Sequence, residues 1–148
     1  MIADISNSLY IDILDASQKI IGQILEVLLT CERSPVLIHC QAGKDRTGIV
    51  CALLLLSLGT ERNFIIDDFM RSNEILLPFF KRMLLLKKIL YLGFFPSKTI
   101  LYAITLRQRN IESVLDRVVN HYGGIQGYLK DVGFDNSRLE ELKNKILI

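Results

Sequence analysis

The sequence predicts an α/β domain that spans residues 1–148, is mostly helical and holds a single clear core strand. The chain has 148 residues, of which 50% are hydrophobic and 23% charged, and it contains only three prolines. This length and composition suit one globular domain with its own core, and they exclude a disordered segment, a collagen-like chain and a coiled coil. Helical periodicity covers most of the chain, and one short β-branched run interrupts it.

The first predicted element is a long amphipathic helix over residues 9–29, with Ser6 or Ser8 as its cap. Pro35 lies just beyond this pattern and is incompatible with its continuation. Residues 36–39 are short, apolar and β-branched, as a buried parallel strand would be. A loop follows at residues 40–45. The predicted apolar stripe of the first helix consists of Leu9, Ile13, Ala16, Ile20, Ile24 and Leu28.

Helices are predicted for most of the remaining chain. Residues 47–58 are apolar on almost every side, which indicates a buried helix, and Gly59 is the residue type that ends one. Thr60 can cap a next helix that runs to about Arg71, and Pro78 marks the start of a later one. Further helices are expected at 110–122, 126–132 and from Asp135 onward, with glycines after the first two.

Residues 79–95 mix Lys and Arg with Leu, Phe and Met. We interpret this stretch as a buried helix whose cationic side chains reach solvent. The alternative is a lid or a membrane-facing surface, whose lysines would suit phosphoinositide headgroups.

The net charge of +2 divides unevenly, with −4 up to Glu74 and +6 after it. Lys and Arg are not interleaved with aromatic residues in a stripe, so the sequence does not indicate nucleic-acid binding. The longest run without a charge, residues 47–60, is shorter than the roughly 20 residues that a transmembrane helix needs. Three cysteines are too few for a disulfide framework, and we therefore expect a cytoplasmic protein.

One segment combines the residue types that bind and attack a phosphate group, His-Cys-Gln-Ala-Gly-Lys-Asp-Arg-Thr-Gly at residues 39–48. The segment is expected to run from a strand through a loop into a helix. The backbone N–H groups of the loop and the positive end of the helix dipole would then surround an anion. Arg46 can hold two phosphoryl oxygens while Cys40, ionised by these neighbours, attacks phosphorus. Thr47 can donate a hydrogen bond to the sulfur, and Gly43 and Gly48 permit close backbone approach. We expect no metal and no organic cofactor.

This loop resembles the signature of the cysteine-dependent protein tyrosine phosphatase superfamily. Gly-Lys-Asp-Arg-Thr-Gly at 43–48 is similar to the bacterial and fungal group of broad specificity, and residues 10–14, 68–73 and 122–129 resemble that group's flanking helices. The resemblance implies a protein tyrosine phosphatase-like fold of the phosphotyrosine phosphatase II type. It also implies hydrolysis of phosphate monoesters, namely phosphotyrosine and, in some members, phosphoserine, phosphothreonine or phosphoinositides.

The resemblance further implies roles for individual residues. Cys40 would be the nucleophile, Arg46 the phosphate clamp and Thr47 the group that stabilises the thiolate. His39 would orient the loop and tune the thiol, and Asp45 could exchange a proton with the leaving group or water. The substrate would be bound by Gln41, Ala42, Gly43, Lys44 and Gly48.

The sequence departs from the family upstream of the loop. Family members place additional strands and a general-acid aspartate there, but only 39 residues precede Cys40. The chain therefore resembles an N-terminally shortened member. A strand at 36–39 would then lack neighbours on both edges, which favours self-association.

Two other functions compete with a phosphatase that acts on a phosphorylated protein or a phosphoinositide. A pseudophosphatase would bind phosphorylated ligands through the intact loop without turnover. A rhodanese-like sulfur transferase shares the Cys-loop-Arg arrangement, but its loop is usually shorter, so the five intervening residues and Thr47 disfavour it.

Overall fold

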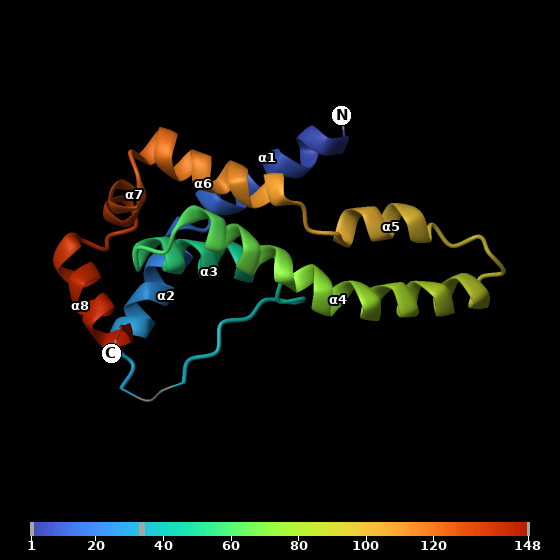
Figure 1. Cartoon of the computed structure of the whole chain (residues 1–148), viewed down its shortest axis with the longest axis horizontal. Coiled ribbons are helices and arrows are strands. Elements are labelled where there is room, and N and C mark those ends of the chain that lie inside the picture. The colour runs from blue at the N-terminus through green and yellow to red at the C-terminus, as the bar shows by residue number, and fades with distance from the viewer. Residues whose placement is uncertain (1, 33–34, 148) are drawn as a thin grey trace.

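The computed structural model describes residues 2–32 and 35–147. These residues form eight helices and no strand. Figure 1 shows most helices gathered in one body, from which the second half of α4 projects with α5 beside it. In chain order the helices are α1 (Ile2–Ala16), α2 (Gln18–Thr30), α3 (Asp45–Ser57), α4 (Arg62–Leu90), α5 (Ser97–Ile104), α6 (Gln108–Tyr122), α7 (Ile125–Asp131) and α8 (Asn136–Ile146).

The long first helix that the sequence predicts is divided in two at Ser17. This residue has φ −95° and ψ 1°, and it separates α1 from α2. Helix α1 begins at Ile2, so Ser6 and Ser8 lie within it and the prediction that one of them caps it is wrong. The end of α2 at Thr30 agrees with the predicted break before Pro35, although residues 33 and 34 lie outside the described part of the chain.

The apolar row that α1 and α2 bury is not the predicted one. Leu9 and Ile20 of the predicted stripe are 53% and 56% exposed. A second row with the same helical period is apolar as well, and the packing of α1 on α6 and of α2 on α8 selects it. The buried side chains of this row are Tyr10, Leu14, Ile21, Leu25 and Leu29.

The predicted core strand at residues 36–39 is not formed. The segment has no regular secondary structure, and Val36 and Leu37 are 38% and 84% exposed. A strand needs the backbone of a neighbour as its hydrogen-bonding partner, and the described residues supply none at this position. The α/β expectation is therefore wrong for these residues, and its helical part is confirmed. Residues 36–39 instead lie beside α2 and line with it a cavity of about 350 Å³.

Helix α3 forms where the sequence predicts a buried helix, although it starts two residues earlier, at Asp45. Ile49, Ala52 and Leu53 are buried on it. Gly59 follows the helix with φ +87°, a conformation that side chains other than glycine's rarely adopt. Its predicted role at the end of the helix is thus confirmed.

Helix α4 is one continuous helix of 29 residues, so the predicted end near Arg71 and the predicted start at Pro78 are both wrong. Its N-cap is Glu61 rather than Thr60. A proline inside a helix costs about 3 kcal/mol, chiefly because the carbonyl four residues earlier loses its partner. Here Pro78 and Glu74 are both exposed, so water can reach the carbonyl of residue 74.

The interpretation of residues 79–95 as a buried helix is also wrong. Leu84 is the one buried side chain in this described stretch. Phe79 and Leu90 are 65% and 77% exposed, and Phe94 is 92% exposed. The apolar residues of this region therefore do not contribute to the main core.

The C-terminal helices agree with the predictions. Gly123, with φ +71°, ends α6, and Gly133, with φ +82°, follows α7. Asp135 caps α8, because its carboxylate accepts a hydrogen bond of 2.9 Å from the backbone N–H of Arg138.

A continuous hydrophobic core joins these helices in the body of the protein. Among the described residues, no helix is both long and apolar enough to cross a membrane. At the junction of α1 and α6, Asp15 accepts hydrogen bonds from Arg117 at 2.9 Å and from the Tyr122 hydroxyl at 2.8 Å. The largest fully buried side chains of the core are Tyr128, Phe134, Leu14, Ile21, Ile49, Ile65, Ile111, Leu115, Leu129 and Leu142.

Candidate active site

Cys40 lies at the start of a tight loop, residues 40–44, that leads directly into α3. Gly43 has φ +67°, and this left-handed conformation turns the loop back on itself. Burial alone would raise the pKa of the Cys40 thiol. Hydrogen bonds from Thr47 and from the backbone N–H groups of Ala42 and Gly43 outweigh it and lower the pKa to about 6. Cys40 is therefore largely a thiolate at neutral pH.

Thr47 is placed to interact with this sulfur. Its Oγ1 atom is buried and has no hydrogen-bond partner in the part of the chain that the structure describes. The side chain and the backbone N–H of Thr47 both lower the pKa of Cys40. A hydrogen bond from this buried hydroxyl to the Cys40 sulfur would satisfy the hydroxyl and would favour the thiolate over the thiol.

Four of the predicted site residues surround one cavity. His39, Cys40, Arg46 and Thr47 line a space of about 210 Å³. Arg46 is exposed, so its guanidinium is accessible to an anion from solvent. The opposite wall of the cavity comes from α1, α2 and the break between them, at Ile13, Ser17, Ile20, Ile21 and Ile24.

Lys44 and Asp45 contact each other through their side chains. Lys44 Nζ lies 2.5 Å from Asp45 Oδ2, and the Lys44 side chain is only 11% exposed. The other carboxylate oxygen of Asp45 accepts a hydrogen bond from the hydroxyl of Tyr10 on α1. Both oxygens of Asp45 are thus engaged, and the residue holds the first turn of α3 against α1.

The remaining predicted residues take different positions. The ring of His39 is exposed, and its Nδ1 atom lies 3.3 Å from the carbonyl oxygen of Cys40, to which an N–H there can donate. Gln41 is exposed at the surface of the loop. Gly48 packs against α4, because a Cβ atom at this position would lie 2.7 Å from two ring atoms of Phe69. Gly48 thus allows α3 to approach α4 closely and does not face the cavity.

Tyr10 is the residue of this site that the sequence analysis did not single out. It is 3% exposed, and its ring packs edge-on against Phe69 with 6.1 Å between the ring centroids. The sequence contained a signal for this residue, because a buried tyrosine within an apolar helical row needs a hydrogen-bond partner for its hydroxyl. The sequence did not indicate that this partner would be Asp45, 35 residues away.

Comparison with known proteins decides the family. A sequence model of the tyrosine phosphatase family matches residues 2–148. The chain belongs to the tyrosine phosphatase family. Membership in this family covers the whole described structure, including the helices that precede and follow the Cys40 loop.

Two curated relatives within the tyrosine phosphatase family illustrate the extent of the similarity. The triple specificity protein phosphatase PtpB of Mycobacterium tuberculosis is 27% identical over 129 residues, which cover 82% of this chain and 47% of that protein. A tyrosine-protein phosphatase of Nostoc commune is 29% identical over 155 aligned positions, which cover 93% of this chain and 47% of the relative. The chain thus spans about half the length of these relatives.

Proposed function

We propose that the chain hydrolyses phosphate monoesters through a cysteinyl-phosphate intermediate, as one tyrosine phosphatase-like domain. The observation that carries this proposal is the Cys40 thiol, whose pKa of about 6 makes it a nucleophile at neutral pH. Arg46 and Thr47 line the same cavity as this sulfur. Membership in the tyrosine phosphatase family supports the same chemistry.

In the first step the Cys40 thiolate attacks phosphorus, so that a sulfur–phosphorus bond forms and the ester oxygen–phosphorus bond breaks. The departing oxygen takes the bonding electron pair and gains a proton from solvent or from an acidic group. Arg46 and the backbone N–H groups of the loop stabilise the phosphoryl oxygens as charge develops on them.

In the second step water attacks the cysteinyl phosphate and releases inorganic phosphate. The sulfur–phosphorus bond breaks and its electrons return to Cys40. The Thr47 hydroxyl stabilises this departing thiolate by the same interaction that lowers the pKa of the free thiol. We assign Asp45 to positioning the first turn of α3, because Tyr10 and Lys44 engage both of its oxygens.

The substrate class that we propose is phosphotyrosine, with phosphoserine, phosphothreonine or phosphoinositides as further substrates. The name of the mycobacterial relative, a triple specificity protein phosphatase, supports testing this range. A thiolate nucleophile has to stay reduced, so we also propose a cytoplasmic location.

The test is hydrolysis of an aryl phosphate, with and without vanadate. We expect vanadate-sensitive release of phosphate that falls at least about 10³-fold in Cys40→Ser and strongly in Arg46→Lys. Cys51→Ser is the matched control, because Cys51 lies on the same helix, α3, and burial raises the pKa of its thiol. This variant should retain its activity.

Two experimental results would contradict the proposal, and each would indicate a different function. Tight binding of phosphotyrosine without release of phosphate would indicate a binding module. Formation of thiocyanate from thiosulfate and cyanide would indicate a sulfur transferase.

A further inference from the structure

The second half of α4, the turn after it and α5 form an arm, defined here as residues 75–105. Figure 1 shows α4 and α5 side by side, extending together away from the other helices. Leu84 is the one buried side chain within the arm, all of whose residues the structure describes. The core of the protein therefore ends near the base of the arm.

The base of the arm is fixed to the body. Asn73 on α4 donates a hydrogen bond of 2.8 Å from Nδ2 to the carbonyl of Leu106, and its Oδ1 accepts one of 2.9 Å from the Leu106 N–H. Leu106 itself is buried. The two ends of the arm are thus held together, and α4 carries it without interruption from the region of Phe69 and Gly48 beside the active site.

The arm exposes an unusual amount of apolar surface. It contains ten of the nineteen large hydrophobic side chains that are exposed among the described residues. Contiguous apolar patches of this kind are rare on proteins without a partner surface. The ten are Ile75, Phe79, Leu85, Leu86, Ile89, Leu90, Tyr91, Leu92, Phe94 and Tyr102.

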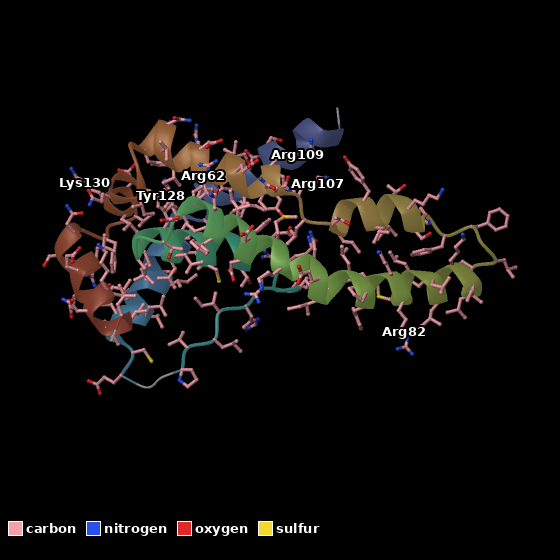
Figure 2. All side chains as sticks on the ribbon, in the orientation of Figure 1. Arg62, Arg82, Arg107, Arg109, Tyr128 and Lys130 are labelled. Carbon is pink, nitrogen blue, oxygen red and sulfur yellow. The ribbon has the colours of Figure 1, made fainter. Side chains whose placement is uncertain are left out.

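On α4 these side chains form a row opposite α5. Ile75, Phe79, Leu86 and Leu90 recur at intervals of four, seven and four residues, which places them on one side of a helix. The buried Leu84 lies on the opposite side. Arg82 belongs to the exposed row, and Figure 2 shows its side chain pointing away from α5.

The tip of the arm adds two further apolar side chains. Leu92 and Phe94 are 86% and 92% exposed. The turn around them is ordered, since Tyr91 and Phe95 stack with ring centroids 5.5 Å apart and Leu92 adopts φ +48°. The left-handed Leu92 closes the C-terminal end of α4, where the Leu92 N–H donates to the carbonyl of Ile89 and the Gly93 N–H donates to the carbonyl of Lys88. The turn therefore leaves the Leu92 side chain exposed.

The charge of the arm is entirely positive. Residues 75–105 contain five cationic side chains and no Asp or Glu, whereas the rest of the chain carries a net charge of −3. All five cations are exposed. They are Lys81, Arg82, Lys87, Lys88 and Lys98.

We propose that the arm docks on the surface of an anionic lipid bilayer. Apolar side chains inserted at the boundary between headgroups and acyl chains, with Lys and Arg beside anionic headgroups, are the two components of interfacial membrane binding. A second copy of the chain is a poorer occupant, because two arms would bring ten like charges together. Docking would hold the Cys40 loop near phosphate esters on the membrane, but it does not depend on catalysis.

The test is sedimentation with lipid vesicles. The full chain should bind phosphatidylcholine vesicles that contain phosphatidylglycerol, and binding should weaken as salt is added and when phosphatidylglycerol is left out. Phosphatidylglycerol is a phosphodiester, so hydrolysis of a monoester does not contribute to this result. Cys40→Ser should bind as the natural chain does.

Matched pairs of variants locate the binding surface. Lys81→Gln with Lys88→Gln should weaken binding roughly 10- to 30-fold, since each cation near an anionic surface contributes about 1 kcal/mol. Lys19→Gln with Lys130→Gln removes two exposed cations from the body and should have little effect. Figure 2 shows Lys130 at the end of the molecule remote from the arm.

The apolar contribution is tested in the same way. Leu86→Ser with Phe94→Ser should weaken binding at least 10-fold, whereas Leu9→Ser with Val119→Ser, two exposed positions on the body, should not. Circular dichroism checks that all variants remain folded.

Three outcomes would overturn the proposal. The first is absence of binding to the anionic vesicles. The second is an equal loss of binding in the arm and body variants. The third is an arm-dependent oligomer in the absence of lipid with no binding to vesicles, because the arm would then be a protein interface.

Discussion

The hydroxyl of Tyr10 donates a hydrogen bond to the carboxylate of Asp45 and so connects α1 to the first turn of α3. Burial, and then the hydrogen bond and charge of Asp45, raise the pKa of Tyr10 well above its usual range, so the residue remains a donor at every physiological pH. Because α3 begins immediately after the Cys40 loop, this contact positions the loop relative to α1, which supplies part of the opposite cavity wall.

Tyr10→Phe should keep the ring contact with Phe69 and lose the hydrogen bonds that the hydroxyl makes with Asp45 and Asn110. We expect the free energy of unfolding to fall by about 1–3 kcal/mol, because the acceptor is a charged carboxylate that is left with one partner fewer. Urea denaturation measures this change. Tyr102→Phe, at an exposed tyrosine on α5, is the control, and equal stability of Tyr10→Phe and the natural chain would contradict the assigned contact.

The pH dependence of Cys40 alkylation should report its lowered pKa. A thiol with a pKa of about 6 is half ionised at that pH, so the rate with iodoacetamide should rise between about pH 5 and 7 and then level off. In Thr47→Val the sulfur loses one donor, and the midpoint should move toward the value of about 8.5 for ordinary cysteine. Mass spectrometry of the Cys40 peptide distinguishes it from Cys31 and Cys51. A natural chain that titrates near pH 8.5 would refute the proposed nucleophile.

Asp45→Asn separates a positioning role from proton transfer. If Asp45 positions α3, hydrolysis of aryl phosphates with good and poor leaving groups should slow by the same factor. If Asp45 instead supplies a proton, the poor leaving group should lose about 10²- to 10⁴-fold more. Asp12→Asn, at an exposed aspartate on α1, serves as the control. Steady-state rates on the two substrates give the answer.

Gly48→Ala should destabilise the packing of α3 on α4. The added Cβ would lie 2.7 Å from Phe69 ring atoms, and overpacking of this kind costs about 1–3 kcal/mol. Phe69→Leu removes the ring, so the double variant should be more stable than the sum of the two single changes predicts. Thermal denaturation of all four chains measures the coupling, and strictly additive losses would count against the contact.

Asn73→Leu should loosen the arm at its base. Two hydrogen bonds to Leu106 are lost, each worth about 0.5–1.5 kcal/mol, so amide hydrogen exchange in α5 should accelerate roughly 10-fold or more. Asn120→Leu changes an exposed asparagine on α6 and should leave α5 unaffected. Unchanged exchange in Asn73→Leu would mean that other contacts hold the arm.

Local signals predicted the second half of the body well. Gly123 and Gly133 end α6 and follow α7 as expected, and Asp135 caps α8, because these roles depend on the conformation of one residue and its immediate neighbours. The same local reasoning failed at Pro78, where an exposed proline is tolerated within α4. It also failed at Ser17, since a break of one residue leaves the apolar period of α1 and α2 almost unchanged.

The candidate site was also predicted only in part from the sequence. The order of Cys40, Arg46 and Thr47 along the chain already indicated a phosphate-binding loop, and the structure brings these residues to one cavity. The prediction of a strand before the loop was wrong, because a strand depends on a partner that residues 36–39 do not find in the described chain. The contact of Asp45 with Tyr10 and the packing of Gly48 on Phe69 were not predicted.

The sequence by itself determined which residue types meet in the loop, since the proposed nucleophile, the donors and the first turn of the helix that follows lie within ten consecutive residues. The tertiary structure alone decided which apolar row of α1 and α2 is buried, what Asp45 contacts, and that residues 75–105 stand away from the core. The physical reason is distance along the chain. Donors close in sequence converge through local backbone geometry, whereas burial depends on which remote helices compete for the same apolar surface.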